Sequence, residues 1–70
     1  MYRIMVVSSD LASVGYDMAT KILEIEFHDG SVYDYFDVPA QIHNELMSAP
    51  SKGGYFHRNI KNRFGYQRVN

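Results

Sequence analysis

The side chains best suited to contact a ligand are gathered in the last twenty residues, Ser51 to Asn70. This segment contains five Lys or Arg residues and no Asp or Glu, and aromatic residues are interleaved with the cations. Because cations neutralise phosphates and exposed rings stack on bases, the pattern is typical of a nucleic-acid contact. The residues that we expect to bind nucleic acid or another anion are Lys52, Gly53, Gly54, Tyr55, Arg58, Lys61, Arg63, Tyr66 and Arg68.

Two adjacent glycines, Gly53 and Gly54, fall at the start of a predicted helix, where each weakens the helix by up to about 1 kcal/mol relative to Ala. The Ser51–Gly54 segment lacks the earlier glycine and the Lys-Ser/Thr order of a P-loop. The backbone N–H groups of this helix start could still receive a phosphate, or the missing side chains could let the helix cross the sheet closely, which we favour. Core packing similarly competes with base stacking as the role of Tyr55 and Tyr66.

No other set of side chains has the spacing of a catalytic or metal site. His28, His43 and His57 fall in three different predicted elements, and the chain has no Cys, so no metal site is predicted. No Ser lies in a G-x-S-x-G sequence. Acids that alternate along a strand, such as Glu24 and Glu26, are typical of a solvated face rather than of a carboxylate catalyst. We therefore expect no catalytic residue, no metal and no cofactor.

Charge is divided unevenly along the chain. Residues 1–50 contain all eight acids and only two cations, Arg3 and Lys21, which gives a formal charge of −6, and the five C-terminal cations bring the total to −1. A free basic surface would attract a polyanion. A basic helix lying on an acidic sheet would give the same composition, so the sequence leaves both arrangements open.

Alternation of apolar and polar residues predicts a short antiparallel sheet. Within Lys21–Phe27, Leu23, Ile25 and Phe27 alternate with Glu24 and Glu26, which indicates a strand with one buried and one solvated face. A preceding strand is predicted at Leu11–Tyr16, where Gly15 would let another backbone come close. We expect a turn at Asp17–Thr20 between these strands and an extended segment at Tyr2–Ser9.

The hairpin at Asp29-Gly30 can be assigned a register, because a slip of one residue moves every side chain to the other face. A two-residue loop would place Asp34 opposite Ile25 and direct a carboxylate into the core, at a cost of several kcal/mol. A three-residue loop, His28–Gly30, instead sets Tyr33 opposite Ile25 and puts its glycine in the left-handed region. We predict the second register, which leaves an acidic outer face of Glu24, Glu26 and Asp34.

Two helices are predicted after the sheet. The first is capped by Asp37, has Pro39 in its first turn and is ended by Pro50. The second is capped by Ser51 and runs to Lys61 or Asn62. Their inward residues at helical spacing are Ile42, Leu46, Ala49, Phe56 and Ile60.

The segment Tyr66–Val69 either returns as an edge strand or trails off. The fold class is therefore α+β, with a short antiparallel β-meander of three to four strands and two helices packed on one face. A chain of 70 residues has room for one domain, which we place at residues 1–70.

A succession of residues with fixed order and spacing runs through nearly the whole chain. Its members are Ser9, Gly15-Tyr16-Asp17, Leu23-x-Ile25-x-Phe27, Gly30, Tyr33-x-Tyr35, Val38-Pro39, Ala49-x-Ser51-x-Gly53-x-Tyr55-Phe56 and Ile60. This succession resembles the KTSC family, a small domain named for its occurrence at the C-terminus of some lysyl-tRNA synthetases and also found free-standing. The resemblance implies a compact α+β domain and no established activity, and its link to RNA comes from the synthetase context. Gly54 and His57 depart from the family pattern.

From these observations we expect a non-catalytic module that binds RNA or another polyanion. The alternative is a protein-interaction module, in which a sheet edge adds a strand from a protein partner or a second copy. The apolar run Ile4–Val7 is too short for a signal peptide or a membrane span, so we expect a soluble, cytoplasmic protein with no membrane partner.

Overall fold

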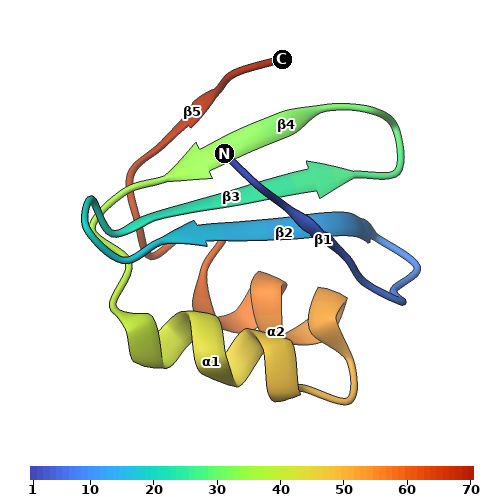
Figure 1. The fold of residues 1–70 in the computed structure, drawn as a ribbon. Coiled ribbons are helices and arrows are strands. Elements are labelled where there is room, and N and C mark those ends of the chain that lie inside the picture. Colours follow the sequence, from blue (N-terminus) through green and yellow to red (C-terminus); the bar gives the residue numbers. More distant parts are fainter.

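Five strands and two helices make up the structure, a computed structural model that describes residues 1–70. The elements are β1 (Ile4–Met5), β2 (Leu11–Asp17), β3 (Ile22–Phe27), β4 (Val32–Tyr35), α1 (Ala40–Ser48), α2 (Lys52–Asn59) and β5 (Tyr66–Arg68). The strands form one antiparallel sheet in the order β1-β2-β3-β4-β5, and both helices lie together on one side of it (Figure 1). This confirms the predicted α+β meander. The sheet has more strands than predicted because both chain ends pair at its edges.

The β3–β4 hairpin has the predicted register. Ile25 lies opposite Tyr33, and Gly30 has a φ of 90°, the left-handed conformation that the three-residue loop requires. The side chain of Asp29 closes the loop, because its Oδ1 accepts hydrogen bonds from the Ser31 backbone N–H at 2.9 Å and from the Ser31 hydroxyl at 2.6 Å. The register directs Leu23, Ile25, Tyr33 and Tyr35 toward the helices and sends Glu24, Glu26 and Asp34 to the outer face.

The hydrophobic core lies between the inner face of the sheet and the helices. The ring of Phe56 on α2 contacts Phe27 and Tyr35 edge to face, with centroids 5.4 and 5.5 Å away. Such aromatic pairs add to the stabilisation from burying apolar area, the main favourable contribution in a chain without disulfides. The core residues are Leu11, Val14, Leu23, Ile25, Tyr35, Val38, Ile42, Leu46, Phe56 and Ile60.

The start of α1 differs from the prediction. Asp37 is not its N-cap: the Asp37 backbone has a φ of 57°, and Pro39 occupies the cap position without a side-chain hydrogen bond. Asp tolerates the left-handed region, so Asp37 makes the turn out of β4. This turn buries Val38, whose N–H donates to the Lys21 carbonyl at 3.0 Å. The left-handed turn at Asp37 thus places Val38 in the core.

The start of α2 is as predicted, but its end comes earlier. The Ser51 hydroxyl accepts a hydrogen bond from the Gly54 N–H at 3.1 Å, which confirms Ser51 as the cap. At the other end, the Phe56 carbonyl accepts from the N–H groups of both Ile60 and Lys61, at 2.9 and 3.0 Å. The regular helical ladder stops at this shared acceptor, so Lys61 and the next residue lie in a turn. Neither helix is long and apolar enough to cross a membrane.

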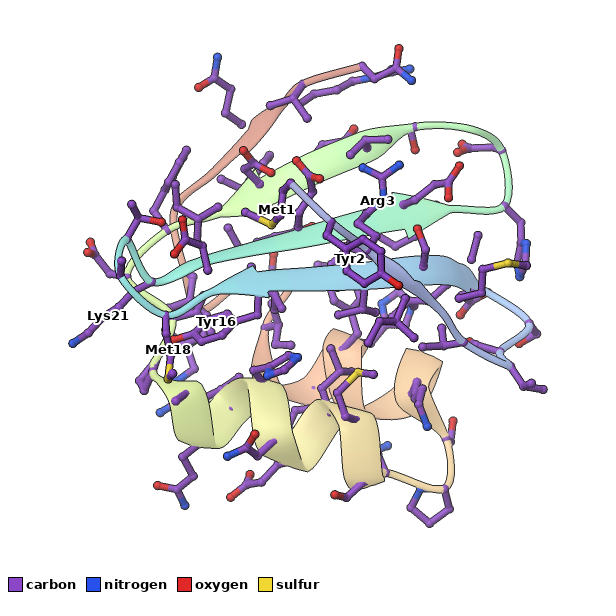
Figure 2. All side chains as sticks on the ribbon, viewed as in Figure 1. Met1, Tyr2, Arg3, Tyr16, Met18 and Lys21 are labelled. Carbon is purple, nitrogen blue, oxygen red and sulfur yellow. The ribbon has the colours of Figure 1, made fainter.

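The N-terminal segment crosses the outer face of the sheet, in front of β2 and β3 in Figure 1. It passes over Gly15, where a Cβ would lie 2.6 Å from the Tyr2 carbonyl oxygen, so the predicted close backbone approach is confirmed. Arg3, labelled in Figure 2, extends along this face, donates to Glu24 Oε2 at 2.8 Å and lies 4.0 Å from Glu26 Oε1. The cation that offsets the acidic outer face thus comes from the N-terminal segment.

Candidate nucleic-acid interface

No C-terminal Lys or Arg forms a salt bridge with an acidic side chain, although the charges of Arg63 and Arg68 help to lower the pKa of Glu45 and Asp29. The salt bridges of the structure join Arg3 to Glu24 and Glu26, and His57 to Asp10. Because Phe56 seats α2 on the apolar face of the sheet, the cations of this segment do not cover the acids of the outer face. All but the half-buried first of them are exposed to solvent. The cations concerned are Lys52, Arg58, Lys61, Arg63 and Arg68.

An open cleft with a volume of about 330 Å3 lies between the margin of the sheet and the end of α2. Aromatic rings from β3, β4, β5 and α2 make up much of its wall. Polar side chains from the β3–β4 loop, α2 and the turn after it complete the lining. The lining residues are Phe27, Asp29, Ser31, Tyr33, Tyr35, Phe56, His57, Lys61, Asn62 and Tyr66.

The pairing of β5 with β4 creates the aromatic part of this cleft. Tyr66 lies opposite Tyr35, and Arg68 lies opposite Tyr33, so strand alternation brings all four side chains to the inner face. The Tyr66 ring centroid is 5.9 Å from that of Tyr33 and 5.8 Å from that of Tyr35. Nevertheless, Tyr66 remains 60% exposed. The margin of the inner face therefore offers an aromatic surface that the helices do not cover.

Tyr35 is a core residue whose hydroxyl opens into the cleft. The side chain is only 4% exposed and packs against Phe56, yet its hydroxyl makes no hydrogen bond within the protein and is not sealed from solvent. Burial, followed by the neighbouring Tyr33 and Tyr66, raises the pKa of Tyr35 to about 12. The hydroxyl consequently keeps its proton at neutral pH and is a free hydrogen-bond donor at the cleft wall.

A second concavity, between α1 and α2, contains two of the predicted site residues, Tyr55 and Arg58. The Tyr55 hydroxyl donates to Glu45 Oε1 at 2.7 Å. Burial, together with this hydrogen bond, raises the pKa of Tyr55 to about 12, whereas the same bond lowers the pKa of Glu45. Tyr55 thus ties the two helices together, and the charge of Arg63 also helps to lower the pKa of Glu45.

Protein groups occupy the start of α2. A Cβ on Gly53 would lie 2.8 Å from Asp10 Oδ2, so the absent side chain admits this carboxylate. The Gly54 N–H is taken by its cap, and Lys52 Nζ donates to the Ala49 carbonyl at 3.2 Å. A carboxylate beside a helix start interacts favourably with the helix dipole, as a phosphate would. The close approach of Asp10 therefore explains why a residue without a side chain stands at Gly53.

The three histidines lie apart, each in its own environment. His28 Nε2 is 2.7 Å from the Ser8 carbonyl oxygen. His43 stacks on Tyr16, which reaches from β2 toward α1 in Figure 2, with centroids 4.7 Å apart and planes 11° apart. Burial lowers the pKa of His43. His57 faces a single carboxylate at 3.5 Å, and no group of three His, Asp or Glu side chains is arranged to hold a metal ion.

The structure therefore divides the site predicted from the sequence. Lys61 and Tyr66 line the cleft, and Arg68 follows on the same face of β5. The guanidinium of Arg63 lies 5.6 Å from the ring centroid of Phe64, and the remaining predicted residues lie between α1 and α2 or at the start of α2. The polar cleft residues Asp29, Ser31, His57 and Asn62 were not predicted from the sequence, and neither Tyr33 nor Tyr35 was among the predicted site residues.

The five-stranded meander with two helices inserted before its last strand places the chain among small α+β domains. The family model for the KTSC domain matches residues 7–64. The chain therefore belongs to the KTSC domain family, which confirms the resemblance found in the sequence.

Similar proteins include both free-standing domains and longer proteins. The crystal structure of a KTSC domain protein from Yersinia pestis superposes with a TM-score of 0.96 at 39% identity, covering 99% of this chain and 97% of that one. A lysine–tRNA ligase of Trichormus variabilis is 50% identical over 54 residues, which are 77% of this chain and 10% of the ligase. An uncharacterised protein of Stutzerimonas stutzeri is 41% identical over 61 residues, covering 87% of this chain and 86% of that protein. The chain thus spans about a tenth of the length of the ligase that it matches.

Proposed function

We propose that this KTSC domain is a non-catalytic module that binds RNA or another polyanion through its C-terminal cations. The observation that carries the proposal is the absence of salt bridges at Arg58, Lys61, Arg63 and Arg68, while Arg3 offsets the acids of the outer face. Cations that form no salt bridge within the protein are available to neutralise phosphates, although Arg68 Nε also donates to the Asn70 carbonyl at 2.6 Å. The similarity to lysine–tRNA ligases, proteins whose name includes an RNA, agrees with this function.

The electrostatic attraction is local rather than global. The net formal charge is −1, so the whole molecule does not attract a polyanion at long range. Screening limits exposed charges to about 8 Å at physiological salt, and the cations act only on phosphates that reach the surface around the end of α2. We therefore expect binding that is readily weakened by salt.

The test is RNA binding measured by fluorescence anisotropy with a labelled single-stranded oligonucleotide at several salt concentrations. The double variant Arg58→Ala with Lys61→Ala removes two of the unpaired cations and should weaken binding at every salt concentration. It should also reduce the salt dependence, because fewer counterions are released. Both side chains are exposed and make no salt bridge, so the fold should survive the change.

Lys21 provides a matched control. It lies in the turn between β2 and β3, at the left of Figure 2. Its φ of 58° is tolerated by Asn, so Lys21→Asn removes one positive charge without straining the backbone. Lys61→Ala should weaken RNA binding more than Lys21→Asn does. Equal effects of the two single variants, or no RNA binding at low salt, would count against the proposal.

Protein interaction through a sheet edge is the second candidate function, and a separate observation favours it. β1 is an edge strand with only two paired residues, yet its own Met5 is 87% exposed, and Tyr2 and Val7 beside it are 86% and 98% exposed. Exposed apolar edges are sites where another strand can add. Molar mass in solution and a pull-down after nuclease treatment separate this function from RNA binding.

A further inference from the structure

We propose that the cleft beside β5 receives a single unpaired nucleobase, so that the domain prefers single-stranded nucleic acid over a duplex. This inference rests on the proposed function and specifies its ligand. It concerns the cleft lined by Tyr33, Tyr35 and Tyr66 rather than the exposed cations as a whole.

The size and shape of the cleft fit one ring system. Its volume of about 330 Å3 is at the lower end of the roughly 300–1,000 Å3 that small-ligand pockets span. The rings of Tyr33 and Tyr66 are tilted by 52° rather than stacked, so neither covers the face of the other. Since Tyr66 is 60% exposed, its face is available to a planar ligand.

The Tyr35 hydroxyl, which opens into the cleft and makes no hydrogen bond within the protein, favours a ligand that carries polar groups. The Tyr35 side chain as a whole is only 4% exposed. Its hydroxyl nevertheless reaches the cleft wall and makes no hydrogen bond within the protein. A ligand that seals the cleft without an acceptor for this hydroxyl would leave it unpaired, so a ligand that offers an acceptor is bound preferentially. The Asn62 amide, a donor and acceptor in one side chain, also lines the cleft. The edge of a nucleobase offers acceptors and donors to both groups.

The surrounding charges fit a base that remains attached to a phosphate backbone. Lys61 lines the cleft, and Arg68 lies on the same face of β5 opposite Tyr33, so these two cations outnumber Asp29, the one acid of the lining. An apolar or aromatic peptide side chain would use the rings but not these cations. In a duplex, the bases are stacked and their pairing edges are occupied, so only an unpaired base can enter.

The experiment compares three labelled or competing ligands: a single-stranded RNA oligonucleotide, a duplex of the same length, and heparin, a polyanion without bases. Wild-type protein should bind the single strand at least about tenfold more tightly than the duplex, since one stacked base contributes about that much or more. Tyr66→Ala should lose about tenfold in affinity for the single strand and leave heparin binding unchanged.

Two further variants keep the test specific. Tyr35→Phe removes only the hydroxyl, preserves the ring in the core, and should weaken single-strand binding severalfold. Tyr2→Ala removes an equally aromatic, 86% exposed side chain on the N-terminal segment and should have no effect. In NMR spectra, the ring protons of Tyr33 and Tyr66 should shift when the single strand binds, which does not depend on any substitution.

The outcomes separate this inference from the proposed function. Failure to bind any of the three ligands would overturn both. Equal affinity for single strand and duplex, with no loss in Tyr66→Ala and no shift of the tyrosine ring protons, would overturn the nucleobase site alone. Loss of heparin binding in Tyr66→Ala would also contradict it, because heparin has no base to stack.

Discussion

Asp34→Asn should stabilise the protein at neutral pH. Asp34 lies opposite Glu24 on the outer face, and its Oδ1 is buried without a hydrogen-bond partner. Burial, followed by the hydrogen bond and the charge of Glu24, raises the pKa of Asp34 from 3.8 to about 6. Asn keeps the shape of the side chain, removes the like-charge repulsion and supplies an N–H donor to Glu24.

The direction of the pH dependence of stability follows from which state, folded or unfolded, holds the Asp34 proton. Between about pH 4 and pH 6 the folded protein retains the Asp34 proton and the unfolded chain does not, so the free energy of unfolding falls as pH rises through this window. A pKa raised by about 2 corresponds to about 3 kcal/mol. Because Asp34 is only partly buried, solvent screening reduces the expected effect to about 1–2 kcal/mol above pH 6.

Glu24 titrates in the opposite sense. Burial acts to raise its pKa, but the hydrogen bonds with Asp34 and Arg3 and the Arg3 charge outweigh burial and lower it overall. Its contribution to stability is therefore lost as pH falls below the ordinary range of a carboxylic acid. Together the two carboxyl groups should give the wild-type protein a stability maximum between their pKa values.

Thermal unfolding followed by circular dichroism tests the prediction across pH 4 to 8. Asp34→Asn should raise the Tm by roughly 5–15 °C at pH 7.5, using about 4–8 °C per kcal/mol for a domain of this size, and by little at pH 4. Glu45→Gln removes the same charge from the exposed side of α1 and should bring no such gain. A gain in Tm for Asp34→Asn that does not depend on pH, or no gain at all, would refute the explanation from the raised pKa of Asp34.

Two further substitutions test the packing of the fold. Gly15→Ala should lower the free energy of unfolding, measured by urea titration, by about 1–3 kcal/mol, because the added Cβ would lie 2.6 Å from the Tyr2 carbonyl oxygen. An unchanged free energy of unfolding would argue against the passage of the N-terminal segment over Gly15. Phe56→Ala should cost about 3–5 kcal/mol and remove most of the stability of a chain this small, and a Tm within a few degrees of wild type would contradict the central position of Phe56 in the core.

The β-sheet could be predicted in detail because one strong effect decides its register. Placing Asp34 in the core would have cost more than any turn preference, and the observed pairing of Ile25 with Tyr33 follows from avoiding it. The helix ends were less predictable, since they depend on tertiary contacts. The turn at Asp37 serves the burial of Val38, and α2 ends where the Phe56 carbonyl accepts two hydrogen bonds.

The cations of the candidate site could be found in the sequence because they are contiguous, but the cleft could not. Its lining comes from two stretches, 27–35 and 56–66, which meet only when β5 pairs with β4. The predicted register, with Tyr33 opposite Ile25, also puts Tyr35 on the inner face, yet it cannot show that the Tyr35 hydroxyl reaches a cleft. Had the predicted edge strand Tyr66–Val69 been aligned against Val32–Tyr35 with Tyr66 opposite Tyr35, the shared aromatic surface could have been predicted.

Salt-dependent RNA affinity tests the central claim most directly. If each of the four exposed cations Arg58, Lys61, Arg63 and Arg68 neutralises one phosphate of a single strand, a plot of log affinity against log salt should have a slope of about −3. The Arg58→Ala, Lys61→Ala double variant should give a slope of about −1.5. A flat plot, or the same slope for both proteins, would contradict binding through this basic surface.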